Sequence, residues 1–182
     1  MYIADIWGGF NISGTLVNPL FTFHQTDTGV ANAEQLTNLT EARKIGSTME
    51  FKAVQLGLRI VPLTSGAVIS PAVAEDMKSL LASAVVTLTY GSNDTKIGEF
   101  SGLHLMNPVD YVAADATNTC AVSSDTVNTN AWINLKAPVS IQANLNIGGT
   151  VRFTRPVPSA LYSTPNTFGF VVIMSGLKVV KS

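Results

Sequence analysis

Two stretches near the end of the chain constrain the fold more than any other feature. From Val139 to Ile147, apolar and polar residues alternate without exception. This period of two indicates a strand with one buried face and one solvated face. From Phe168 to Met174 every residue but one glycine is apolar. A strand that is apolar on both faces belongs in the middle of a packed structure, so the pattern predicts an all-β protein closed by its last strands.

Three glycines are predicted to shape this region. Gly148 and Gly149 follow the alternating stretch and are expected to close a hairpin, because glycine takes positive φ without steric cost. The returning strand is predicted over residues 150–155 and ends at Pro156, since proline cannot donate to the ladder. Gly176 is expected to mark a bulge or turn before the chain resumes an apolar strand.

Two short helices are predicted earlier in the chain. In the first, over residues 32–45, Asn32 caps the helix and Gln35 completes a capping box. The second covers Pro71–Ser83, with Ser70 as the cap and proline at the first helical position. Both carry an apolar stripe at helical spacing, which would pack on the strands.

The remaining strands are predicted from alternation and turn residues. Residues 47–61 change parity midway, so a bulge near Val54 is needed to keep both apolar sets inside. Residues 84–90 and 95–100 form a hairpin, and Leu103 and Leu105 are expected to continue its second strand. The list of predicted elements is completed by an edge strand over residues 16–23 and a long polar loop over residues 107–130.

About eight strands of uneven spacing, with long connections and no internal repeat, favour a two-sheet jelly roll over a meander barrel. At 182 residues the chain is expected to form one such domain, residues 1–182. Residues 1–14 are apolar without a clear period, which leaves a strand with a turn or an N-terminal arm that packs on a neighbouring subunit. We favour the arm, and on that interpretation deletion of residues 1–10 leaves a folded domain that no longer assembles.

Composition limits the functions that the chain can have. Charged residues are 13% of the sequence, against about 25% in ordinary domains, and the net charge is −1 without a basic run. Direct nucleic-acid binding is therefore not expected. A surface with few charges is typical of one buried against neighbours, although extracellular β-proteins share it. The single cysteine, Cys120, excludes an internal disulfide, and no signal peptide or membrane span is recognised, so synthesis in the cytoplasm is expected.

Catalytic and metal-binding patterns are not found in the sequence. The two histidines, His24 and His104, stand without the residues that a catalytic triad or a zinc site needs. A Ca²⁺ ion shared by loop residues is weighed against a plain solvated loop, and the solvated loop is favoured because the spacing matches no calcium loop. We expect no enzyme activity, no cofactor and no metal. The loop residues considered for Ca²⁺ are Asp110, Asp115, Asp125 and Asn118.

The order of these features resembles the jelly-roll major capsid proteins of tailless icosahedral bacteriophages, several of which enclose a membrane. The resemblance rests on the long strand and helix of residues 49–83, the hairpin of residues 85–100, the run from Val151 to Pro156, and the final run from Phe170 to Leu177. It is a likeness of pattern over most of residues 47–181 and involves no diagnostic motif. Family members often carry two jelly rolls, whereas this chain has room for one, which points to the single-jelly-roll branch or to a vertex protein.

The resemblance implies a structural virion protein that self-assembles into an icosahedral shell, located in the virion after synthesis in the host cytoplasm. The expected partner is the protein itself; a second capsid protein and an internal viral membrane are further partners that the family allows. The alternative is a carbohydrate-binding or receptor-binding β-sandwich, such as a spike or penton protein, using Trp7, Trp132, Tyr111 and Tyr162. The residues predicted to contact other subunits are Tyr2, Ile3, Ile6, Trp7, Phe10, Tyr111 and Val112.

Overall fold

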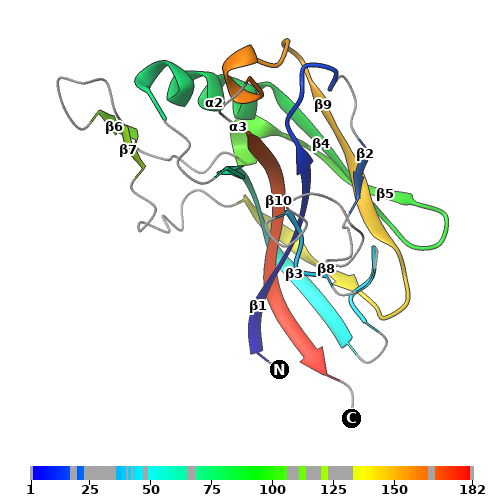
Figure 1. Ribbon diagram of the computed structural model, residues 1–182. Coiled ribbons are helices and arrows are strands. Elements are labelled where there is room, and N and C mark those ends of the chain that lie inside the picture. The colour runs from blue at the N-terminus through cyan, green and yellow to red at the C-terminus, as the bar shows by residue number, and fades with distance from the viewer. Residues whose placement is uncertain are drawn as a thin grey trace.

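The protein is a sandwich of two four-stranded antiparallel sheets, shown by the computed structural model in Figure 1. The first sheet has the order β1 (Tyr2–Asn11), β10 (Phe168–Val180), β3 (Met49–Pro62), β8 (Ile133–Ile141). The second has the order β2 (Leu20–Thr22), β9 (Ile147–Phe153), β4 (Ala84–Tyr90), β5 (Thr95–Ser101). The other elements are α2 (Pro71–Ser83), α3 (Gly102–Leu105), the hairpin of β6 (Tyr111–Ala113) and β7 (Cys120–Val122), and the 3₁₀ turn η2 (Ser159–Leu161).

The structure describes residues 2–16, 20–22, 36–39, 41, 43–46, 49–64, 69–105, 111–113, 120–122, 133–163 and 167–180. For residues 2, 20–22, 105, 111–113 and 120–122 it describes the backbone alone.

The strand pairing shows that the sandwich is a jelly roll. β4 pairs with β5, β3 with β8, β2 with β9 and β1 with β10, so four antiparallel pairs are nested one outside the other along the chain. Two further pairings, β3 with β10 and β4 with β9, join these pairs into the two sheets. A long hairpin rolled up in this way has the double Greek-key order of a jelly roll. The predicted fold class is confirmed.

Strand β10 lies between β1 and β3, as its sequence requires. All residues from Phe168 to Met174 are buried, with Phe170, Val172 and Met174 facing the second sheet. The register with β3 shifts at Ser175/Gly176, where Val54 is the extra residue on β3. The bulge predicted from the parity change near Val54 and the bulge predicted at Gly176 are therefore one irregularity, shared by the two neighbouring strands.

The core between the sheets is built from the alternate residues of each strand whose side chains point inward. At its upper end three rings meet: Phe10 stacks on Phe170 at 5.4 Å between centroids, and Phe153 meets Phe170 edge-on at 5.5 Å. Such offset and edge contacts contribute about 0.5–1.5 kcal/mol each beyond the buried area. These ring contacts join β1, β9 and β10 at this end of the core.

Helix α2 closes the same end of the sandwich and matches the prediction residue by residue. It spans Pro71–Ser83, and the Ser70 hydroxyl oxygen accepts a hydrogen bond from the Val73 amide at 3.3 Å. The predicted hairpin that follows is β4 and β5. Leu103 and Leu105 do not continue β5, however, but lie in the short helix α3. A Cβ on Gly102 would come within 1.9 Å of the Leu81 carbonyl oxygen, so this glycine is needed for α3 to turn against the end of α2.

The predicted hairpin turn at Gly148–Gly149 is wrong by several residues. The chain turns between β8 and β9 over residues 142–146, where Asn144 has a φ of 64°. Both glycines lie inside β9, and a Cβ on Gly149 would stand 2.0 Å from the Thr87 carbonyl oxygen of β4. Gly149 therefore allows the backbones of β9 and β4 to approach closely and does not form a turn.

The predicted helix over residues 32–45 is also wrong beyond Leu36, as far as that segment is described. Residues 37–39, 41 and 43–45 form isolated β-bridges, a turn and irregular backbone, and the φ of 62° at Arg43 is incompatible with a right-handed helix. Leu36 and Leu39 are buried as predicted. Leu36 belongs to the cluster on the outer face of the first sheet and Leu39 to the core between the sheets, so the segment passes the edge of β1. Asn32 and Gln35 lie outside the described residues.

Replacing Gly149 tests the close approach of β9 to β4. We expect Gly149→Ala to lower the free energy of unfolding by about 2–3 kcal/mol, because the new methyl group overlaps backbone that cannot move without breaking the sheet. Urea denaturation followed by tryptophan fluorescence measures the change. Ser92→Ala, in the exposed β4–β5 turn, should stay within about 0.5 kcal/mol of the wild type. Equal stability of the two variants would contradict the inferred contact.

Candidate functional site

The predicted N-terminal arm is a strand of the fold. Residues 2–11 pair with residues 169–178 of β10 without interruption, so β1 forms the edge of the first sheet. Of the two alternatives, strand or arm, the structure has the strand. The physical reason is β10, whose apolar residues need a neighbour on each side, and β1 supplies one of them.

The predicted contact residues on β1 divide between its two faces. Ile6 and Phe10 point into the core, where Ile6 is 8% exposed and Phe10 stacks on Phe170. Ile3 and Trp7 have the opposite parity and lie on the outer face of the sheet. For Tyr2 the structure describes the backbone, which pairs with Lys178.

The upper part of this outer face is covered by the chain itself. Leu36 and Leu63 pack on Val171 and Ile173 of β10, and Trp7 lies partly buried against the same cluster. Much of the Trp7 side chain therefore packs within its own chain.

The lower part of the outer face carries apolar residues that are more exposed. Ile3 is 80% exposed and stands directly opposite Leu177 of β10, on the same face. Two residues further along β10, Val179 shares this face, and Val180 at the tip is 55% exposed. We call these four residues the ribbon end. In Figure 1, β1 and β10 extend together from the lower end of the molecule, beside both termini.

A polar clamp covers the edge of β1 next to the ribbon end. The Asn38 side chain donates from Nδ2 to the Asp5 carbonyl oxygen at 2.7 Å, and its Oδ1 accepts from the Trp7 amide at 3.0 Å. Gly8 forms a β-bridge with Thr37 beyond it. An uncovered edge invites pairing with other strands, and the clamp satisfies this edge from Asp5 to Gly8.

The loop residues predicted to contact other subunits lie elsewhere. Tyr111 and Val112 are in β6, whose backbone pairs with Val122 and Ala121 of β7. Figure 1 places this hairpin to one side of the sandwich, away from the ribbon end. The structure therefore does not bring the two predicted groups together. The side chains of Tyr111 and Val112 are outside the description, so their role as contacts stays a prediction.

The described histidine and acidic residues form no cluster of the kind that catalysis or metal binding needs. His104 is exposed on α3, and His24, Asp110, Asp115, Asp125 and Asn118 fall outside the description. Lys96 donates a hydrogen bond to Glu99 at 2.6 Å and holds the pKa of that carboxyl below its usual value. Across the described ranges, no group of three or more histidine, cysteine, aspartate or glutamate residues is placed to hold a metal ion. Nor does any described helix have the length and apolar character to span a membrane.

Sequence reasoning missed two features of this region. Leu177, Val179 and Val180 were not recognised as surface residues, although Lys178 between them signals alternation after the bulge. Asn38 was assigned to a helix, and nothing in the local sequence marks it as a clamp on β1.

The clamp can be tested by truncating its side chain. Asn38→Ala should destabilise the protein by about 1–3 kcal/mol, because the partly buried Trp7 amide loses its acceptor. Thermal unfolding by circular dichroism gives the difference. Asn93→Ala, exposed in the β4–β5 turn, is the matched control and should leave the midpoint unchanged. If Asn38→Ala behaves like the control, the clamp contributes nothing.

Comparison with protein-family models, with curated proteins and with solved structures finds no match for this chain.

Proposed function

We propose that this protein is a structural virion protein, a capsid subunit whose single jelly roll associates with copies of itself to form an icosahedral shell. Its work would be the burial of complementary surfaces, with no chemical step. Virion localisation and association with a second capsid protein or an internal membrane belong to the same proposal.

The fold supports this proposal at a general level. The jelly roll is the architecture of many viral capsid domains, but lectins and cupins also use it, so the fold alone does not assign the function. The low content of charged residues, 13%, is compatible with a surface that other subunits cover.

The observation that carries the proposal is the ribbon end. A β-branched residue that is 80% exposed, beside Leu177 and Val179 on one face of a sheet, forms an apolar surface that single-chain packing does not use. Exposed apolar surface of this kind marks sites of association. Its position at the projecting ends of β1 and β10 leaves it sterically accessible to another copy (Figure 1). In a closed symmetric shell each contact repeats many times, so a small surface in each subunit is sufficient.

The alternative, a carbohydrate-binding module, is less well supported by the geometry. Trp7 is partly buried against Leu36 and Val171, so its faces are not open for stacking on a sugar. Tyr162 is 38% exposed, but its ring lies over Gly14, within 3.1 Å of where a Cβ would stand. Trp132 and the ring of Tyr111 lie outside the described residues. No described pair of aromatic side chains forms an exposed platform.

Light scattering after size exclusion tests the proposal directly. The wild-type protein should form discrete oligomers or large particles as its concentration rises. Ile3→Asp should shift the midpoint of association to at least roughly tenfold higher concentration, because a carboxylate would lose its hydration in the contact.

Thr95→Asp is the matched control, since Thr95 is an exposed strand residue at the edge of the second sheet. It should associate like the wild type. Circular dichroism should show that both variants are folded. A wild-type protein that stays monomeric at every salt concentration and at high protein concentration would contradict self-assembly.

A further inference from the structure

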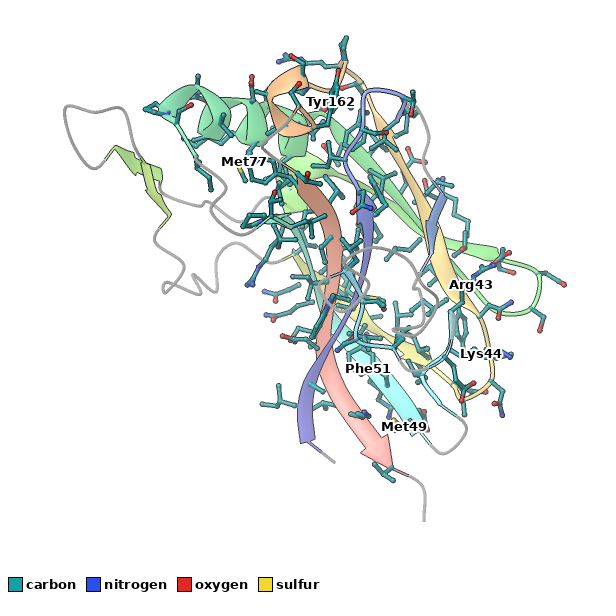
Figure 2. All side chains as sticks on the ribbon, in the orientation of Figure 1. Arg43, Lys44, Met49, Phe51, Met77 and Tyr162 are labelled. Atoms are coloured by element: carbon teal, nitrogen blue, oxygen red, sulfur yellow. The ribbon has the colours of Figure 1, made fainter. Side chains whose placement is uncertain are left out.

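A pocket opens at the lower end of the sandwich, on the inner side of the first sheet. It lies between β1, the start of β3, the end of β10 and residues 38, 39, 44 and 45, near Met49, Phe51 and Lys44 in Figure 2. None of the features used above for self-assembly explains it. The residues that line it are Ala4, Asp5, Ile6, Asn38, Leu39, Lys44, Ile45, Met49, Phe51 and Lys178.

The outer wall of the pocket is fixed to both sheets. On one side Asn38 holds the wall to β1 through the two hydrogen bonds of the clamp. On the other side the Arg43 carbonyl oxygen accepts from the Ile147 amide of β9 at 2.9 Å, and the Arg43 guanidinium pairs with Asp94 in the β4–β5 turn. A wall attached at both ends keeps the pocket open without a ligand, and a pre-formed pocket avoids an ordering cost on binding.

The inside of the pocket is apolar. Ile6, Leu39, Ile45 and Phe51 each expose 8% or less of their surface, and Met49 extends the lining toward the opening. An aliphatic group that enters would replace water against these side chains.

The charged lining residues carry a net positive charge. Lys44 and Lys178 contribute two ammonium groups, whereas the Asp5 side chain has the outer-face parity of Ile3 and Trp7. Among the described residues Lys44 forms no ion pair, whereas Lys178 already has an interaction within the fold. Lys44 is therefore the group best placed to receive an anion.

The volume of the pocket limits the size of its occupant. It offers about 90 Å³. An engineered cavity of about 150 Å³ in another protein accepts benzene, so by proportion this pocket takes roughly four carbon atoms.

We propose that this pocket binds a short aliphatic carboxylate, with a chain of about four carbons against Ile6, Leu39 and Phe51 and the carboxylate beside Lys44. The proposal is independent of capsid assembly, because Ile3, Leu177 and Val179 of the ribbon end lie on the outer face of the sheet and the pocket on the inner face. A carboxylate of this size could be a free short-chain acid or the end of an acidic molecule whose remainder stays in solvent.

Methionine-methyl NMR provides a test with an internal control. Met49 lines the pocket, whereas Met77 is buried in α2 and is not part of the lining. Titration of ¹³C-methyl-methionine protein with butyrate should shift the Met49 signal and leave that of Met77 in place. The dissociation constant should be on the order of 1 mM, as expected for so small a ligand.

A series of ligands separates the contribution of the ligand's aliphatic chain to the affinity from the contribution of its charge. Affinity should rise from acetate to pentanoate and then level off, because further methylenes would extend into solvent. 1-Butanol should bind less tightly than butyrate, and butylamine less tightly than butanol. Butyryl-glycine compared with butyrate distinguishes the two sources: tighter binding of free butyrate favours a free acid, and equal or tighter binding of the conjugate favours the end of a larger molecule.

Lys44→Gln should weaken butyrate binding by roughly 2- to 5-fold, the range for one exposed ion pair, and leave butanol binding unchanged. Lys136→Gln, on exposed β8, is the control and should bind butyrate like the wild type. The proposal is overturned if Met49 does not shift selectively in the wild-type protein, if butyrate and butylamine bind equally, or if the two lysine variants behave alike.

Discussion

The rest of the structure depends on one constraint, which is that strand β10 must be paired along both edges and covered on both faces. β10 is apolar on both faces over residues 168–174, so it needs a strand along each edge and a packed layer above and below. β1 and β3 provide the edges, and the second sheet provides the inner layer. On the outer face, Leu36 and Leu63 provide the remaining cover. The coverage ends where the chain becomes amphipathic after Gly176, and there the ribbon end begins.

Patterns that are complete within one element could be predicted from the sequence. Three patterns can be recognised from the residues of a single element: the alternation of β4 and β5, the capped helix α2 and the parity change in β3. Each was placed correctly. The nested order of the jelly roll followed from the number and spacing of strands together with the central position of β10. These features depend on local periodicity, which a single sequence records.

The errors share a different cause. Gly149 was assigned to a turn and lies in a strand, because the contact that requires glycine is with Thr87, more than sixty residues away. Leu36 and Leu39 have helical spacing but are fixed by contacts to β1 and β10. Ile3 was predicted to contact another subunit and is exposed, but its neighbour Leu177 could be identified only after the register of β1 with β10 was known. The pocket could not be predicted at all, since its lining comes from four separate parts of the chain.

The nested pairing also has a consequence for biosynthesis. β1 pairs along its whole length with β10, so after its synthesis β1 waits for residues 169–178 before it has a strand beside it. β3 likewise lacks one neighbour until β10 emerges, whereas the local pairs β4 with β5 and β6 with β7 can form early. Contacts so distant along the chain close slowly. The first sheet therefore completes only after translation has passed residue 180, and until then the nascent chain exposes unpaired apolar strands of the kind that favour aggregation.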